Sequence, residues 1–150
     1  MTTPLAQPRT FALSEIDTIA REIVDMVDAG DAILLSGDLG AGKTTLAKAI
    51  AAALGVHETI TSPTFTLMNV YTTAHPTMKS LMHMDTYRME RPEELVEIGV
   101  DSYLGEPNTI SLVEWPERFP DAWSGASRQW WFTLRGTGET RTIELTTTAA

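Results

Sequence analysis

A glycine-rich segment carries the residues with the clearest chemistry. Residues 37–44 follow the spacing Gly-x-x-x-x-Gly-Lys-Thr, which is typical of a phosphate-binding loop. Glycines let backbone N–H groups turn toward an anion. Lys43 would place its charge on the β- and γ-phosphates, and the Thr44 hydroxyl would ligate the bridging Mg²⁺. The nucleotide-binding residues expected here are Gly37, Asp38, Leu39, Gly40, Ala41, Gly42, Lys43, Thr44 and Thr45.

A phosphate loop also needs an acid near the metal ion, usually at the end of an apolar strand. Asp85 follows the run 81–84, and Glu114 follows the run 110–113. Strand ends of this kind lie at the carboxyl edge of a sheet, where ligands bind. One acid could hold Mg²⁺ through water while the other polarises the attacking water, and the sequence leaves open which does which. The alternative is a solvated acid at a strand end.

Four further residues lie near these positions in the chain or carry suitable charge. His83 precedes Asp85 by two residues and shares its face of the strand, so it could orient the site or simply pack. Trp115 follows Glu114 and could shape the site or serve the core. Arg88 and Arg141 are candidates for neutralising phosphate charge, and surface ion pairs are the alternative. Three scattered histidines do not indicate zinc.

The surrounding pattern predicts one α/β domain over residues 1–150 with a mostly parallel sheet and antiparallel strands toward the C-terminus. A helix capped by Ser14, with Asp17 as the capping acid, runs to Val27, and Gly30 stops it. The other expected helices are 44–54 and 93–98. The expected strands are 32–35, 65–71, 81–87, 109–115 and a hairpin of 129–135 with 140–146. Residues 1–9 and 147–150 are expected to be loose ends.

Composition limits the classes of partner. The 150-residue chain has 11 basic and 20 acidic residues, a net charge of −9 and no basic cluster. Tight direct binding of tRNA or DNA is therefore not expected, because contacts with phosphates need a basic surface. The chain has no cysteine, no long apolar run and no pattern of a signal peptide at its first residues. We expect a cytoplasmic protein without membrane spans or disulfides.

With these residues in view, the sequence resembles the TsaE family, also known as YjeE, of small bacterial ATPases of tRNA threonylcarbamoyladenosine synthesis. The resemblance covers the chain from about Ser14 to about Leu145. It rests on ordered blocks: the phosphate loop 37–45, Ser-Pro-Thr-Phe-Thr-Leu at 62–67, His-Met-Asp-Thr-Tyr-Arg at 83–88, Pro-Glu-Glu-Leu at 92–95 with Gly99 and Tyr103, and Leu-Val-Glu-Trp-Pro-Glu-Arg at 112–118. Thr86 stands where the family often has leucine, and 72–79 differs in detail.

The resemblance implies Mg²⁺-dependent ATP hydrolysis, with Asp85 in catalysis or metal binding and Glu114 near the metal. It implies that Thr64 lies in a loop sensing the γ-phosphate and that Arg141 contacts the nucleotide. The implied partners are the TsaD and TsaB proteins, which transfer threonylcarbamoyl to tRNA, and activity without them would be weak. The acidic balance agrees with docking on a protein rather than on tRNA.

Two other functions fit the same loop. A small-molecule phosphate-loop kinase usually carries an arginine-rich lid, and Arg88 and Arg91 are the nearest pair here. A nucleotide-dependent switch with negligible hydrolysis would act only by binding a partner. The Asn/Thr-Lys-x-Asp motif of guanine-specific proteins does not occur in the chain, which favours ATP.

Overall fold

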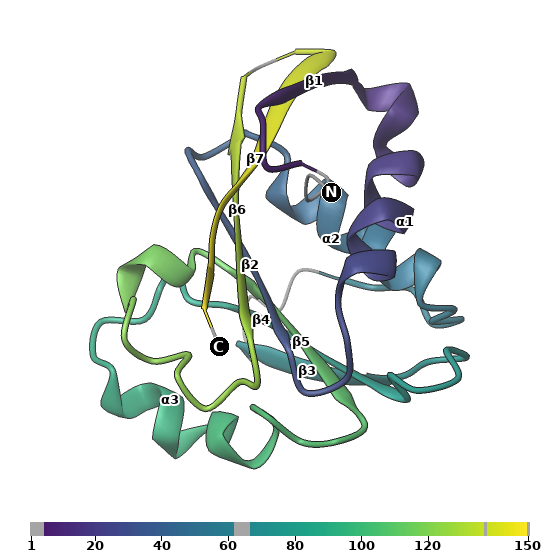
Figure 1. Ribbon diagram of the computed structural model, residues 1–150. Helices are drawn as coiled ribbons and strands as arrows, with labels where there is room; N and C mark the ends of the chain where they lie inside the picture. Colours follow the sequence, from purple (N-terminus) through teal and green to yellow (C-terminus); the bar gives the residue numbers. More distant parts are fainter. Residues whose placement is uncertain (1–4, 62–66, 137, 150) are drawn as a thin grey trace.

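The computed structural model describes residues 5–61, 67–136 and 138–149, and for residues 147–149 it describes the backbone alone. It shows a single sheet of seven strands (Figure 1). The strands are β1 (Arg9–Ala12), β2 (Ala32–Gly37), β3 (Met68–Thr72), β4 (Ser80–Asp85), β5 (Thr109–Glu114), β6 (Gln129–Arg135) and β7 (Thr140–Ala149). Their order across the sheet is β1-β7-β6-β2-β5-β4-β3. The four central strands are parallel, whereas β1, β7 and β3 pair antiparallel. The predicted mixed sheet is confirmed, and antiparallel pairing occurs at both edges.

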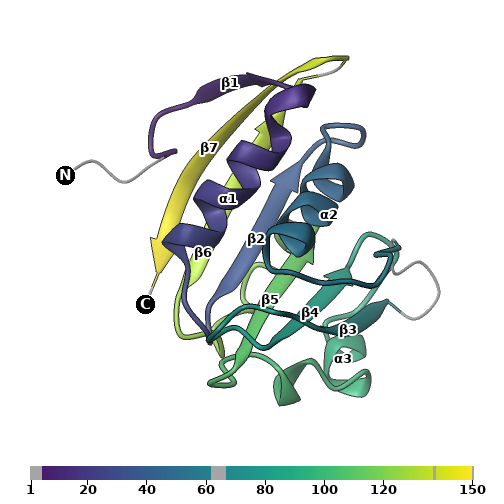
Figure 2. The ribbon, with the colours of Figure 1, turned by 90° about the vertical axis from the view of Figure 1, so that its right-hand side faces the viewer.

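Helices cover both faces of the sheet. The helices α1 (Ile16–Met26) and α2 (Lys43–Ala53) lie side by side on one face (Figure 2). The opposite face carries the short helix α3 (Glu93–Glu97) and the 3-10 turn Val100–Ser102. Two more 3-10 turns, Leu13–Glu15 and Pro116–Arg118, precede α1 and follow β5. None of the helices in the described residues has the length and hydropathy needed to span a membrane.

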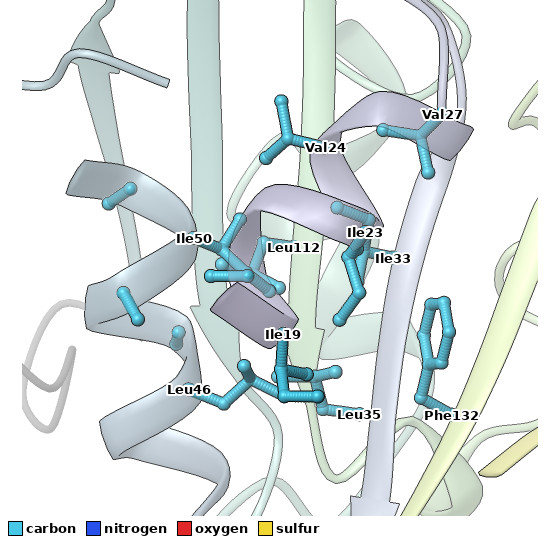
Figure 3. Packing of buried hydrophobic residues seen from close by; sticks show 14 of the residues in the cluster. Ile19, Ile23, Val24, Val27, Ile33, Leu35, Leu46, Ile50, Leu112 and Phe132 are labelled. Carbon is cyan, nitrogen blue, oxygen red and sulfur yellow. The ribbon is translucent and has the colours of Figure 1, made fainter. Parts of the chain in front are cut away.

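The apolar run of β2 serves both faces at once. Ile33 and Leu35 pack with α1 and α2 (Figure 3). Ala32 and Leu34 face the cluster under α3. All four side chains are fully buried. A strand covered by helices on both sides needs apolar residues at successive positions, not alternate ones. This requirement explains why an uninterrupted apolar run correctly predicted a central parallel strand.

The beginning of the chain differs from the prediction. Residues 5–9 are not loose, because Leu5 is buried, its carbonyl accepts from the Leu145 N–H, and β1 begins at Arg9. Ser14 does not cap α1. Instead, the Glu15 carboxylate accepts from the Ala12 N–H at 2.9 Å, and Ala12, two residues before the predicted cap, precedes a 3-10 turn over Leu13–Glu15. The polar edge strand β1 lacked the apolar alternation by which strands are recognised.

Other boundaries shift by a few residues. α1 ends at Met26, so Gly30 lies in the turn beyond it and not at the helix end. β7 continues to Ala149, and the expected loose end at 147–149 is wrong because these residues pair with the start of β6. The strand expected at 65–71 is β3, shifted to 68–72, with Leu67 at a φ of 64° before it. Residues 65 and 66 lie outside the described residues.

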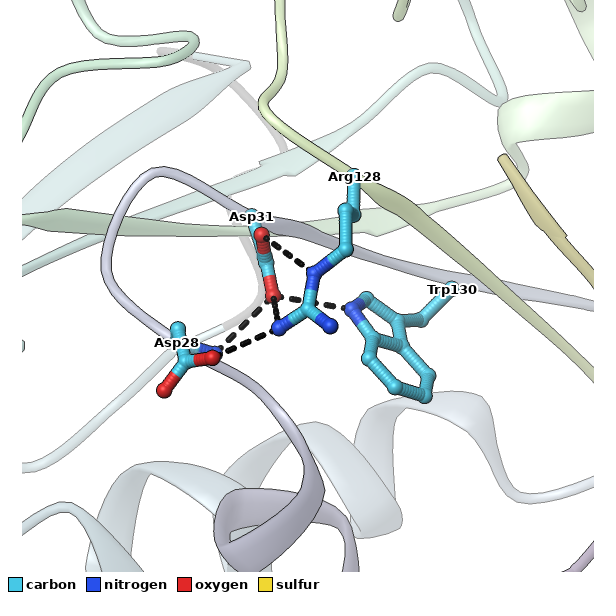
Figure 4. A network of polar contacts seen from close by, with 4 residues as sticks. All are labelled: Asp28, Asp31, Arg128 and Trp130. Carbon is cyan, nitrogen blue, oxygen red and sulfur yellow. Dashed lines mark hydrogen bonds and ion pairs between the residues drawn. The ribbon is translucent and has the colours of Figure 1, made fainter. Parts of the chain in front are cut away.

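A buried carboxylate ties the start of β2 to the start of β6. Asp31 is 1% exposed, and its oxygens accept from the Trp130 indole at 2.9 Å, the Arg128 guanidinium at 3.0 Å and the Asp28 N–H at 2.9 Å (Figure 4). Arg128 also contacts the exposed carboxylate of Asp28 at 2.6 Å. The network holds two neighbouring parallel strands at the end of the sheet opposite the phosphate loop.

Candidate functional site

The phosphate loop joins the carboxyl end of β2 to the first turn of α2, as the motif requires. Gly37 closes β2 with a φ of 141°, and a Cβ there would lie 2.4 Å from the carbonyl oxygen of Leu134 in β6. Gly42 precedes α2 in a left-handed conformation with a φ of 103°. Side chains at either position would be strained. The phosphate loop therefore points the N-terminus of α2, an 11-residue helix, toward the concave side of the loop.

Lys43 is folded against its own loop. Its ammonium donates to the Gly37 carbonyl at 2.6 Å and to the Asp38 carbonyl at 2.8 Å. It also lies 3.8 Å from the centre of the Trp115 ring, a cation–π distance. Burial lowers the pKa of Lys43, and the nearby carboxylates of Glu117, Glu114, Asp85 and Asp38 oppose that shift. These acids help to keep a buried lysine charged.

Glu114 is the most enclosed acid of the site. It is 1% exposed at the end of β5. Its Oε1 accepts from the Thr44 hydroxyl at 2.6 Å, and its Oε2 lies 2.7 Å from His83 Nε2. The parallel register places Glu114 opposite Leu35 of β2 on one side and Asp85 of β4 on the other. The two acids predicted from strand ends therefore occupy adjacent strands at one edge.

Asp85 is half-buried and less constrained. Asp85 is the final residue of β4. Its Oδ1 accepts a hydrogen bond from the Tyr87 N–H at 2.8 Å. Burial raises the pKa of Asp85, the Tyr87 hydrogen bond lowers it, and the charge of Glu114 raises it again. A carboxylate with raised basicity at a ligand-facing edge suits the orientation of a water molecule.

The backbone that follows Glu114 holds an unusual conformation. Trp115 has a φ of 62° and a ψ of 42°, the left-handed region that a bulky residue seldom occupies. Its carbonyl accepts a short hydrogen bond from the hydroxyl of buried Thr86, and its ring contacts Tyr87 at 4.8 Å between centroids. The conformation turns the ring over Lys43. Trp115 thus forms a wall of the site. The sequence alone left open whether this residue shapes the site or serves the core.

One cavity gathers most of the predicted residues. It has a volume of about 380 Å³. It is lined by Leu39, Gly40, Gly42, Lys43, Thr44, Thr45, Asp85, Tyr87, Glu114, Trp115 and Arg141. Arg141 reaches it from β7 and donates through Nε to the Ala41 carbonyl at 3.1 Å. Gly37, Asp38 and Ala41 belong to the loop but do not line the cavity, and Thr64 lies outside the described residues.

Sequence reasoning missed two residues of this region. Tyr87 lines the cavity two positions beyond Asp85, and Glu117 accepts from the Gly37 N–H at 3.2 Å three positions beyond Glu114. Both follow strands whose last residues were already candidates, and that proximity was the available signal. Arg88, by contrast, is exposed and does not line the cavity.

The donor set suits a hard cation. Thr44, Glu114 and Asp85, whose side chains carry oxygen atoms, all line the cavity. No cluster of three or more His, Cys, Asp or Glu side chains that could hold a metal occurs in the described residues. Mg²⁺ on a phosphate loop does not need such a cluster, because nucleotide phosphates and water supply most of its ligands. The residues therefore fit Mg²⁺ bound together with a nucleotide.

Comparison with known proteins decides the family. Residues 11–143 match the family described as threonylcarbamoyl adenosine biosynthesis protein TsaE. The chain belongs to the TsaE family. The resemblance seen in the sequence blocks is thereby confirmed, and the phosphate loop with its two strand-end acids lies within the matched region.

Individual relatives agree. The tRNA threonylcarbamoyladenosine biosynthesis protein TsaE of a Nostoc species is 42% identical over 99 residues, which cover 64% of this chain and 59% of the relative. The TsaE protein of Bacillus subtilis is 40% identical over 107 residues, covering 71% of this chain and 64% of that protein. These matches thus span about three fifths of the lengths of those relatives.

A solved structure supports the same fold. The crystal structure of Bacillus subtilis YdiB superposes with a TM-score of 0.68 at 27% identity, covering 95% of this chain and 84% of that one. The architecture of this TsaE-family chain is that of a phosphate-loop NTPase-like α/β protein, as the sequence predicted.

Proposed function

We propose that this chain binds ATP with Mg²⁺ and hydrolyses it in support of threonylcarbamoyladenosine modification of tRNA, acting with the TsaD and TsaB proteins. The observation that carries the proposal is the contact of Thr44 with Glu114 at 2.6 Å, beside Lys43 on a glycine loop. A hydroxyl held in this way directs its lone pairs away from the acid, toward the position of a metal ion on the phosphates.

The triphosphate would lie along the glycine loop. Backbone N–H groups of the loop and the N-terminus of α2 supply donors and a partial positive charge. Lys43 exchanges its present carbonyl partners for oxygens of the β- and γ-phosphates. Arg141, whose side chain lines the same cavity, adds a second positive charge. Together these groups select an anion with several negative charges.

The two acids explain why a divalent cation is needed. Asp85 and Glu114 line a cavity that would also receive a polyanion, and repulsion between them would oppose binding. Mg²⁺, when bound, would be held by Thr44 Oγ1 with Glu114 and Asp85 acting through water, and it neutralises charge on the β- and γ-phosphates. Glu114 keeps the Thr44 hydroxyl in place for that role.

We assign to Asp85 the role of orienting the water molecule that attacks the γ-phosphate. One oxygen of its carboxylate accepts from the Tyr87 N–H, and no hydrogen bond to the other occurs among the described residues. Both oxygens of Glu114 are already engaged, with Thr44 and His83. Asp85 is therefore freer to orient water, and its raised pKa favours acceptance of a proton.

The role in tRNA modification rests on membership of the TsaE family and on charge. The names of the Nostoc and Bacillus subtilis relatives state that role for those proteins. A net charge of −9 disfavours direct binding of tRNA by this chain. A protein partner that binds the tRNA, as TsaD and TsaB would, resolves this conflict.

The test measures phosphate release and tRNA modification by the purified chain with Mg²⁺, alone and with TsaD and TsaB. We expect slow release alone and modification only in the complete mixture. Lys43→Ala should abolish nucleotide binding or turnover, while Lys48→Ala, which removes an exposed lysine from the same helix, should change neither. Normal phosphate release by Lys43→Ala would refute the mechanism.

Variants of the acids separate binding from chemistry. Asp85→Ala and Glu114→Ala should each reduce hydrolysis more than ATP affinity, and wild-type turnover by either would refute its role. Transfer of the phosphate to a small acceptor would establish the kinase instead. Nucleotide-dependent partner binding with no phosphate release, even with TsaD and TsaB, would establish the non-hydrolysing switch.

A further inference from the structure

His83 is a buried histidine that the proposed chemistry leaves unused. It lies on β4 two residues before Asp85, and its side chain is 0% exposed. Its Nε2 is 2.7 Å from Glu114 Oε2. The ring lies behind the acid, because the cavity is lined by Glu114 and not by His83. His83 therefore has no access to a bound nucleotide except through Glu114.

Glu114 depends on its two contacts. A carboxylate that is 1% exposed is costly unless its oxygens accept hydrogen bonds. The Thr44 hydroxyl serves Oε1 and His83 serves Oε2. These two bonds point in different directions and fix the rotation of the carboxylate about its own axis. If His83 were lost, the carboxylate could rotate or tilt, and the Thr44 hydroxyl would lose its fixed partner.

The proton arrangement follows from the other ring nitrogen. Nδ1 of His83 is buried and has no hydrogen-bond partner among the described residues. A neutral ring with its proton on Nε2 donates to Glu114 and leaves Nδ1 as a bare acceptor. With the proton on Nδ1 instead, the Nε2 lone pair would face a carboxylate oxygen at 2.7 Å with no hydrogen between them. The geometry therefore favours the Nε2–H tautomer as the donor.

We infer that His83 is a positioning residue: its Nε2–H holds the Glu114 carboxylate in the orientation in which Oε1 fixes the Thr44 hydroxyl for the metal ion. The inference rests on the proposed Mg²⁺-ATP chemistry of the same cavity. Partners that orient a metal-site ligand from behind typically contribute 10- to 100-fold to metal affinity or activity. The corresponding loss is expected here in steps that need Mg²⁺.

The test uses two side chains of similar shape. Glutamine can place an amide N–H near the position of Nε2, whereas methionine fills similar space without a donor. We expect His83→Met to lower kcat/KM for ATP in the presence of Mg²⁺ by about 10- to 100-fold. His83→Gln should recover most of that loss. Wild-type turnover by His83→Met, or equal impairment of both variants, would overturn the inference.

Two further measurements keep the outcome decisive. His83→Asn places its amide near Nδ1, so it should not rescue; if His83→Met fails to fold, the comparison of glutamine with asparagine decides instead. Calorimetric titration with ATP, with and without Mg²⁺, gives a readout without turnover. His83→Met should lose most of the gain in affinity that Mg²⁺ confers and keep the affinity measured without it.

These readouts also separate the two proposals. If the wild type releases no phosphate under any condition but Mg²⁺ strengthens its binding of ATP, the proposed hydrolysis fails, and the titration alone decides the role of His83. A Mg²⁺ gain in His83→Met equal to that of the wild type would overturn the positioning role. In a Glu114→Ala background, adding His83→Met should have little further effect, because the group that it positions is gone.

Discussion

Removal of the Asp31 carboxylate tests how the sheet is held at the end far from the nucleotide site. Asp31→Ala leaves the buried Trp130 indole N–H without its acceptor, a cost of about 1–3 kcal/mol. It also breaks the pair with Arg128, and breaking a buried pair costs about 3–5 kcal/mol. Arg128 is 36% exposed and keeps Asp28, so the lower end applies. We expect the lower ends of these two costs together, a loss of about 4 kcal/mol, or about 8–16 °C in Tm for a chain of this size.

The control is the second acid on the same arginine. Asp28 contacts Arg128 at 2.6 Å, closer than Asp31, but its side chain is 81% exposed. Such pairs contribute at most about 1 kcal/mol, so Asp28→Ala should be nearly neutral. Urea unfolding at pH 7, followed by far-ultraviolet circular dichroism, measures both variants. If Asp31→Ala and Asp28→Ala lost the same free energy of unfolding within about 0.5 kcal/mol, burial of the carboxylate would not determine the strength of this network.

Three further predictions concern the site. Because burial raises the pKa of Asp85, the folded protein binds the proton of this carboxyl more tightly than the unfolded chain does. The protonated carboxyl therefore stabilises the fold at low pH. This stabilisation is lost as pH rises from about 3.9, the pKa in the unfolded chain, through the higher pKa in the folded protein. The stability of the wild type relative to Asp85→Asn in urea unfolding should therefore fall as pH rises over this range, and a difference that does not change with pH would contradict the raised pKa. Thr44→Val should cost about 1–3 kcal/mol without any nucleotide, because it leaves a buried oxygen of Glu114 unpaired, whereas Thr44→Ser should not. In thermal unfolding, Gly37→Ala should lose at least about 2 kcal/mol of stability, because the new Cβ would contact β6 at a position of positive φ. At Gly40 a Cβ would meet open space, so Gly40→Ala should lose only the about 1–2 kcal/mol that a positive φ costs.

The sequence predicted the elements whose signals are local. The buried strand β2, the helix α2 after the glycine loop and the hairpin of β6 and β7 all carry strong patterns of composition or turn residues. β1 was missed because its residues, Arg9–Ala12, become a strand only by pairing with β7 more than 120 residues later. No local pattern reports such a partner. The same holds for the end of β7, where pairing overrides a polar, threonine-rich composition.

The site divides in a similar way. The loop residues follow from the motif, and Asp85 and Glu114 follow from their positions at strand ends. The proposed division of labour between the acids needed the register, because only the pairing of β5 with β2 brings Glu114 against Thr44. Trp115 needed its backbone conformation, since a left-handed residue is not visible in composition. Tyr87 and Glu117 were missed because loops carry no periodic pattern.

The central place of β2 has a consequence for synthesis of the chain. Both neighbours of β2, the strands β5 and β6, lie far downstream, since β2 ends at Gly37 and β5 begins at Thr109. At 5–20 residues per second, a ribosome would need about 4–14 s to make the first neighbour. During that interval an apolar strand has no edge partner, which favours aggregation. A chain released before residue 109 should therefore pellet on centrifugation, and a monodisperse fragment would show that α1 and α2 alone protect the strand.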